Sequence, residues 1–289
     1  MAEWLQVIYG GLTIGSIYSL VALGFSLIYR TIGLVNFAQG GILMLGAYVG
    51  AILLERTGAP FPLAVAGAVV AVGLLGLVIE RVLRPLERGD LTLMLLATLG
   101  LDIVFTNSAI VVFGSEGISI GVPLVGEPIR LLDVTMTRYS LVVIGSMVLI
   151  TVALNTFLNR TKTGLGMRAI AINRDVALVF GVNVDRMNNL AFGIGASIAA
   201  AAGVLIAPIL YVTPQLGASV GISGFAAAIL GGLGNLPGAV VGGLTFGILQ
   251  GVVSVYLPAY VDAIAFVIFV LVLLVRPWGI LGERVVEKL

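Results

Sequence analysis

The chain has 289 residues, of which 60% are apolar and only 10% are charged, and its mean hydropathy is +1.17. A soluble domain is roughly 45–50% apolar and about 25% charged, so the composition excludes one and indicates a polytopic integral membrane protein. The net charge of +1 argues against a nucleic-acid partner. The chain contains no cysteine and no histidine, which excludes disulfides, thiol catalysis, and thiolate or imidazole metal sites.

Long apolar runs define the predicted fold, since a helix needs about 20 residues to cross the hydrocarbon core. They predict an all-α bundle of about nine transmembrane helices, with eight to ten compatible with the pattern, and a single transmembrane domain over 1–289. The seventh run is short, so we expect a broken or re-entrant segment near 214–232. The nine runs are 5–29, 39–54, 62–83, 91–113, 139–158, 188–210, 219–232, 237–256 and 260–275.

Arginine and lysine are distributed unevenly between the two sides of this predicted bundle. Twelve of the fifteen lie in or near the segments 30–38, 84–90 and 159–187 or the C-terminal tail, and these are Arg30, Arg81, Arg84, Arg88, Arg160, Lys162, Arg168, Arg174, Arg186, Arg276, Arg284 and Lys288. Because basic residues concentrate in cytoplasmic loops, we expect the N-terminus outside and the C-terminus in the cytoplasm. In the longest outer loop, 114–138, the alternating sequence IRLLDVTM predicts a short hairpin.

The longest cytoplasmic segment, 159–187, contains signals for a short helix of its own. Asn173 is placed as an N-cap, Arg174, Asp175 and the run VALVF follow, and Gly181 is placed to end the helix. Asp185 is then expected to cap the next span. The sequence therefore predicts a helix of about two turns between two membrane spans.

The apolar residues of this short helix, Val176, Val179 and Phe180, have no predicted core to bury in. One reading is that the helix docks into a groove on another protein. The other is that it lies on the lipid headgroups, anchored by Arg168 and Arg174. The residues by themselves leave both readings open.

The stretch TIGLVNFAQGG at 31–41 places polar side chains between two apolar runs. The predicted orientation puts Asn36 at the cytoplasmic face, where part of the stretch would be a wetted loop. Gln39, Gly40 and Gly41 then open a glycine-rich span. We interpret the stretch as a broken helix near an inner gate. Its pathway or gate candidates are Asn36, Gln39, Gly40 and Gly41.

Other polar residues inside or beside the apolar runs are further pathway candidates. Asp102 lies near the middle of the run 91–113, with Asn107 nearby, and an ionisable group at bilayer depth costs roughly 2.5–3.5 kcal/mol. It should therefore face protein or water, either as a pathway residue that meets a substrate ammonium or as a structural aspartate that is protonated or bonded to threonine or asparagine. Gln215 precedes the broken segment, and Asn235 lies in the Gly- and Pro-rich stretch GGLGNLPG.

The sequence does not predict an enzyme. A P-loop needs a glycine-rich loop followed by Gly-Lys-Ser/Thr, and neither Lys162 nor Lys288 lies in that pattern. The absence of histidine excludes a Ser-His-Asp triad. The remaining classes are a subunit of an ATP-driven importer, a secondary transporter, and a channel or structural membrane subunit.

Four stretches, in chain order, carry a family resemblance: GLVNFAQGGILMLGAYVG, GLGMRAIAINRDVALVFGVNVDRM, ILGGLGNLPGAVVGGLTFGILQ at 229–250, and RPWGILG at 276–282. In the second, Asp175, Ala177 and Gly181 follow the pattern of a coupling-helix loop. Together they resemble the permeases of ABC importers, in the reduced form of the branched-chain (hydrophobic) amino acid permeases of LivH type. The resemblance runs from about residue 8 to 282.

The resemblance implies a single permease domain whose coupling helix sits in a cleft of an ATPase subunit, with Arg174, Asp175, Val176, Ala177, Val179, Phe180 and Gly181 as its residues. Implied partners are two ATPase subunits, which bind ATP and magnesium so that this chain needs no cofactor, a second permease copy or paralogue, and a periplasmic or lipid-anchored solute-binding protein. The implied location is the bacterial or archaeal cytoplasmic (inner) membrane. The implied solute is a hydrophobic or branched-chain amino acid, with urea, short amides and small carboxylates as alternatives.

Overall fold

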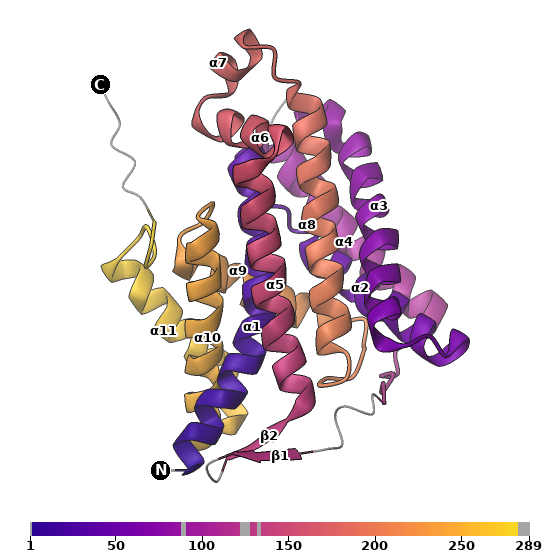
Figure 1. Cartoon of the computed structure of the whole chain (residues 1–289), viewed down its shortest axis with the longest axis vertical. Coiled ribbons are helices and arrows are strands. Elements are labelled where there is room, and N and C mark those ends of the chain that lie inside the picture. The colour runs from indigo at the N-terminus through magenta and orange to yellow at the C-terminus, as the bar shows by residue number, and fades with distance from the viewer. Residues whose placement is uncertain (1, 88–90, 122–127, 132–133, 283–289) are drawn as a thin grey trace.

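Helices make up most of the computed structural model, which describes residues 2–87, 91–121, 128–131 and 134–282 (Figure 1). Arg88, Arg284 and Lys288, which entered the charge count above, lie outside the described residues. The elements are α1 (Ala2–Ile32), α2 (Gln39–Thr57), α3 (Phe61–Glu87), α4 (Leu91–Phe113), β1 (Pro128–Leu131), β2 (Val134–Thr137), α5 (Arg138–Arg160), α6 (Lys162–Ile172), α7 (Arg174–Val179), α8 (Val184–Ile206), α9 (Leu216–Gly231), α10 (Leu236–Tyr256), the 3₁₀ turn η2 (Pro258–Tyr260) and α11 (Val261–Val275).

The number of membrane-spanning helices agrees with the sequence. In the described part of the chain, eight helices are long and apolar enough to cross a membrane, and α9 is a ninth, shorter apolar helix of 16 residues. At 1.5 Å per residue, α9 is about 24 Å long, less than the ~30 Å hydrocarbon core. The predicted helical membrane bundle and its short segment near 214–232 are therefore confirmed. The predicted hairpin is present as β1 paired antiparallel with β2.

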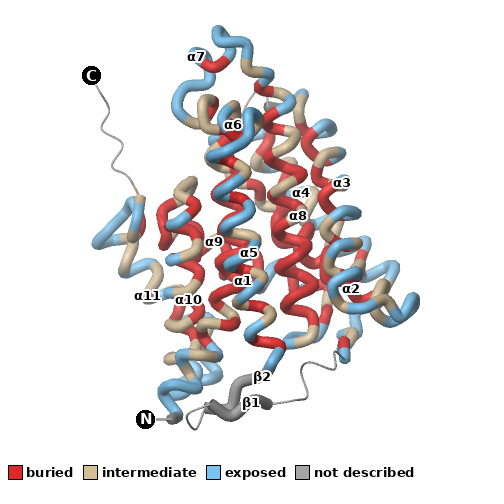
Figure 2. Tube along the Cα trace, viewed as in Figure 1, coloured by how far each residue is buried: buried red, intermediate tan, exposed pale blue. Residues whose placement is uncertain are grey.

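Glycines allow α1 and α10 to pack at very short range. A Cβ at Gly11 would lie 2.7 Å from Ile248 Cα, and a Cβ at Gly15 would lie 2.9 Å from the carbonyl oxygen of Gly243. In lipid, where apolar burial gives little driving force between helices, such close contact supplies van der Waals attraction. Figure 2 shows the result, a buried interior along α1, α8 and α10 surrounded by helices with exposed outer faces.

Helix α8 differs from its prediction at both ends. The apolar run continues to residue 210, but the helix ends at Ile206 because Pro208 lacks the backbone N–H that the next turn requires. At its start, the cap is Asn183, whose side chain accepts a hydrogen bond from the Arg186 N–H. The prediction that Asp185 caps this helix is therefore wrong, and Asp185 lies in the first turn instead.

Helix α2 begins in the interior of the bundle and not at its end. Helix α1 ends near α6, and Gly33, with φ +81°, turns the chain back inward. The Gln39 amide then contacts Gly195, at the midpoint of α8, while Gly41 contacts Asp102, at the midpoint of α4. From this depth α2 runs toward the hairpin end (Figure 1). The loop 33–38 therefore enters the bundle instead of crossing its surface.

Candidate functional site

The short helix predicted between 173 and 181 is present as α7, and its ends are fixed by local hydrogen bonds. The Asn173 side chain accepts from the Val176 N–H at 3.0 Å. At the other end, Gly181 has φ +80° and its N–H donates to the Leu178 carbonyl, while the Val182 N–H donates to the Ala177 carbonyl. This pair of bonds is a Schellman motif, which ends a helix at a left-handed glycine.

Helix α7 exposes apolar side chains at the tip of the molecule. Ala177 is buried, whereas Val179 is 86% and Phe180 83% exposed. Arg174, Asp175 and Val176 are exposed as well. Figures 1 and 2 show α7 projecting beyond the bundle, at the end opposite the hairpin. Six of the seven residues predicted for coupling therefore form one accessible surface, and Ala177 is not part of it. We call this surface the α7 tip: Arg174, Asp175, Val176, Val179, Phe180 and Gly181.

The sequence analysis missed α6, the helix that carries α7. Its N-cap is Thr161, whose side chain accepts a hydrogen bond from the Gly164 N–H at 3.0 Å. Gly164 also allows α6 to fold back on the end of α5, since a Cβ there would collide with Leu158. The Thr-x-x-Gly spacing at 161–164 is the signal that would have revealed this second helix.

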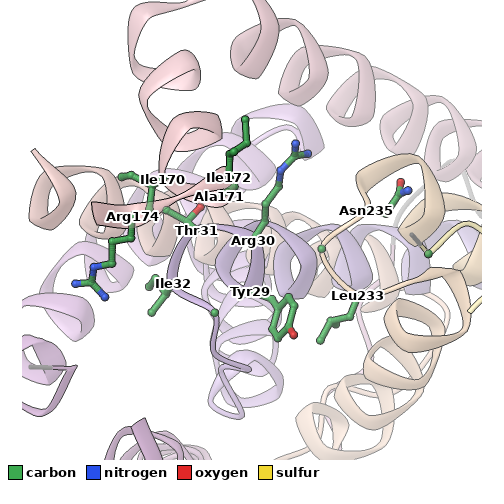
Figure 3. Close-up of a pocket in the computed structure, with 13 residues that line it drawn as sticks. Tyr29, Arg30, Thr31, Ile32, Ile170, Ala171, Ile172, Arg174, Leu233 and Asn235 are labelled. Atoms are coloured by element: carbon green, nitrogen blue, oxygen red, sulfur yellow. The ribbon is translucent and has the colours of Figure 1, made fainter. Parts of the chain in front are cut away.

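A groove of about 710 Å³ lies beside the α6–α7 junction. Figure 3 shows Arg174 and Asn235 on opposite sides of it, with Tyr29 and Arg30 of α1 between them. Asn235 caps α10 by accepting from the Gly238 N–H, and its amide donates to the Leu281 carbonyl. The structure therefore places this gate candidate close to the α7 end.

Asn36 and Gln39 form a buried polar cluster where α2 begins. Both side chains are fully buried, so the expectation that Asn36 lies in a wetted loop is wrong. Asn36 accepts from the Ala38 N–H and donates to Gln39 Oε1 at 3.4 Å, and Gln39 Nε2 donates to the Gly195 carbonyl at 3.0 Å. Gly24 leaves the room for this amide, because a Cβ there would collide with Gln39 Nε2. A broken helix is present here, but it lies deeper than predicted.

Two side chains of α4 accept hydrogen bonds from backbone N–H groups at or just before the start of α2. Ala38, at the N-cap position, makes no side-chain cap bond. Asp102 Oδ1 accepts from the Gly41 N–H at 2.8 Å, and Thr98 Oγ1 accepts from the Phe37 N–H at 3.2 Å. Asp102 thus caps α2 from a neighbouring helix, and its partner is a backbone amide, not the threonine or asparagine that the structural reading expected.

The remaining pathway candidates do not join this cluster. Asn107 is on the exposed face of α4, where its amide donates to the carbonyl of Ile103 in its own helix. Gln215 is exposed at the start of α9 and makes no side-chain cap bond. Gly40, in contrast, packs directly on α9, since a Cβ on it would lie 2.5 Å from the Gly217 carbonyl oxygen.

One buried polar group was missed entirely. Glu80 of α3 is fully buried, accepts two hydrogen bonds from Arg84 at 3.0 and 2.7 Å, and accepts a third from Asn189 of α8 at 2.6 Å. The Glu–Arg spacing of four residues was a visible signal, since such residues meet on one helix face. Burial of the carboxylate between α3 and α8 was not readable from that spacing.

The buried Gln39 amide, which bonds Asn36 and the Gly195 carbonyl, is expected to stabilise the fold. We expect Gln39→Met to lower the free energy of unfolding by roughly 1–3 kcal/mol, because the Asn36 amide would remain buried without its acceptor. Methionine keeps the side-chain length, so packing is nearly conserved. Thermal unfolding of the purified protein measures the effect, with Gln215→Met at the exposed start of α9 as control. Equal melting temperatures for the two variants would contradict the prediction.

Known proteins resemble the chain over almost its full length. The family model described as "Branched-chain amino acid transport system / permease component" matches residues 7–273. The high-affinity branched-chain amino acid transport system permease protein LivH of Escherichia coli (strain K12) is 35% identical, over 99% of this chain and 97% of that protein. BraD, the permease protein of the same description from Pseudomonas aeruginosa, is 34% identical over 99% and 98%.

A probable LivH permease of the archaeon Methanocaldococcus jannaschii is 28% identical over 96% of this chain and 92% of that protein. The solved structure "PsaBC from Streptococcus pneumoniae in complex with Fab" covers 93% of this chain and 91% of its own, with a TM-score of 0.49 and 14% identity, too weak a likeness to support a conclusion. The family match and the two relatives above 30% identity agree with the bundle of membrane-spanning helices. This chain belongs to the family of branched-chain amino acid transport system permease components.

Proposed function

We propose that the chain is the transmembrane permease subunit of an ABC importer for branched-chain amino acids. Its membership of the permease family supports this function, and the relatives that match its full length are described as branched-chain amino acid permeases. The structural observation that carries the proposal is the α7 tip, where Val179 and Phe180 lie exposed on a well-capped helix. An apolar helix presented in this way fits a groove on a partner protein.

In this proposal ATP hydrolysis takes place in two partner ATPase subunits, which hold ATP and magnesium, and the permease is not itself an enzyme. Closure of those subunits would push on the α7 tip. Helix α6 packs against the end of α5, and Thr161 is the single residue between the two helices, so the movement would pass through α6 to the membrane helices. A second permease, either another copy or a paralogue, and an external solute-binding protein complete the complex.

The distribution of charge supports an orientation with the N-terminus outside and the C-terminus in the cytoplasm. Among the described residues, Arg56, Arg130 and Arg138 belong to the ends of helices and the strand at the hairpin side of the bundle. The other nine basic residues lie toward the α7 end, and they are Arg30, Arg81, Arg84, Arg160, Lys162, Arg168, Arg174, Arg186 and Arg276. Basic residues favour the cytoplasmic side, so the α7 end would face the ATPase subunits.

Uptake by the reconstituted complex tests the proposed function. The permease, its ATPase subunits, its partner permease and its binding protein are placed in liposomes loaded with ATP. We expect ATP-dependent uptake of leucine, isoleucine and valine at rates at least tenfold above those of urea, acetamide and small carboxylates. Preferential uptake of urea or amides would show that the solute is not a branched-chain amino acid. Uptake without the ATPase subunits would show that the protein is a secondary transporter or a channel and not part of an ATP-driven importer.

A further inference from the structure

A second cavity lies at the depth where α2 begins, and its volume is about 300 Å³. This is at the lower end of the range for small-molecule sites, ~300–1,000 Å³. Its lining includes Asp102, which is at the midpoint of α4, and Gly40, in the first turn of α2. Because α4 has the length of a membrane span, the cavity lies near the middle of the predicted bilayer.

Only one oxygen of the Asp102 carboxyl group has a hydrogen-bond partner among the described residues. Its Oδ1 accepts from the Gly41 N–H at 2.8 Å, and no other hydrogen bond or ion pair to Asp102 occurs within the described ranges. An asparagine would cap α2 equally well and without a charge. An aspartate at this depth costs roughly 2.5–3.5 kcal/mol to insert. The cap therefore explains an oxygen at Gly41 but not the choice of an ionisable residue.

The wall facing this carboxylate is aromatic and aliphatic. Phe225 of α9 packs on Phe25 and Phe37, with ring centroids 5.4 and 5.7 Å apart. Ile222 also lines the cavity and is 55% exposed. Phenyl rings accept both aliphatic groups and cations, the latter with about 0.5–2 kcal/mol of attraction. One charged group beside an apolar wall suits the cationic and the apolar end of an amino acid, and the first turn of α9, where Gly217 and Ala218 line the same cavity, suits its carboxylate because a helix N-terminus favours negative charge.

We propose that this cavity is a passage site inside the membrane for the transported amino acid, in which Asp102 receives the α-ammonium group and the Phe25–Phe37–Phe225 wall receives the aliphatic side chain. The inference rests on the proposed function and adds a substrate contact within the permease itself. An ammonium that leaves water needs an opposite charge, since an unpaired ion in a low-dielectric interior is strongly disfavoured. Oδ2 of Asp102 supplies that charge while Oδ1 stays on Gly41.

The variant Asp102→Asn separates a substrate contact from a structural one. Asparagine keeps an oxygen for the Gly41 N–H and removes only the charge. In the complete complex, with saturating leucine-loaded binding protein, we expect the initial rate of leucine uptake to fall at least tenfold. The yield of the assembled complex should stay at the wild-type value. Ser108→Ala, an exposed change on the same helix, is the matched control and should transport normally.

A second variant tests the cavity by its volume. Ile222→Trp extends an exposed side chain at the cavity wall, so it should obstruct passage and lower leucine uptake at least fivefold without disturbing the core. Val152→Trp, on the exposed side of α5, is its control. Wild-type uptake by both Asp102→Asn and Ile222→Trp would overturn the passage site while leaving the importer function intact. Failure of the wild-type complex to import any amino acid would overturn both proposals together.

Discussion

Replacing Val179 and Phe180 with aspartate should detach the permease from its ATPase subunits while leaving it folded in the membrane. The two side chains are 86% and 83% exposed, so the folded chain loses almost no internal packing. In the proposed complex they are the buried anchors of the interface, and truncating such anchors typically costs 2 kcal/mol or more, which is about 30-fold in affinity. Two buried carboxylates would add a desolvation cost.

Co-purification of the ATPase subunits measures this effect directly. A tagged double variant should retain its own yield and membrane insertion but recover less than about a tenth of the ATPase subunits, and leucine uptake should be lost with them. Leu165→Asp is a suitable control, because Leu165 is 62% exposed on α6 at the same end of the molecule. Normal assembly and uptake by the double variant would show that the α7 tip does not couple ATP hydrolysis to transport.

Replacing Gly11 with leucine should strongly destabilise the bundle, whereas the same change at its neighbour Gly10 should be tolerated. A Cβ at Gly11 would lie 2.7 Å from Ile248 Cα and 2.9 Å from the Gly247 carbonyl oxygen, so α1 and α10 would have to separate. Around Gly10, no atom lies within 4 Å of the added Cβ. Overpacking of this kind costs up to about 3 kcal/mol, and here the obstacle is backbone, which cannot change rotamer.

The pair of glycine variants is informative because both residues lie in one helix. Each substitution gains the same helix propensity, about 0.5–1 kcal/mol, so the difference between them isolates the packing of α1 against α10. Thermal unfolding of the purified permease should give a markedly lower midpoint for Gly11→Leu and one near or above wild type for Gly10→Leu. Similar midpoints would mean that the two helices are not held at the short range that the structure shows.

Local features were readable from the sequence because the interactions behind them span only a few residues. The apolar runs determine the spans, since any 20-residue apolar stretch satisfies its own backbone as a helix in lipid. Asn173 and Gly181 determine α7, because the bonds at its ends join residues no more than five positions apart. The short hairpin follows in the same way from a local pattern, the alternating sequence of its strands.

The candidate site needed the tertiary structure, because its bonds join distant segments. Gln39 contacts Gly195, 156 positions away, and Gly41 contacts Asp102, 61 positions away. The distribution of arginine and lysine predicted Asn36 at the surface. That distribution indicates which side of the membrane a loop faces, but not how deeply the loop folds into the bundle. Glu80 and Asn189 are likewise 109 positions apart.

The sequence by itself determined a polytopic helical membrane protein, its family resemblance and the capped helix α7, because composition, periodicity and capping act over one or two turns of chain. Only the tertiary structure decided that α2 starts in the interior, that Asp102 caps it from another helix, and that an aromatic cavity lies beside that carboxylate. The physical reason is that the depth at which α2 starts, and the surroundings of the Asp102 carboxylate, depend on which helices pack together. Glycine contacts between helices that are distant in the sequence set that packing.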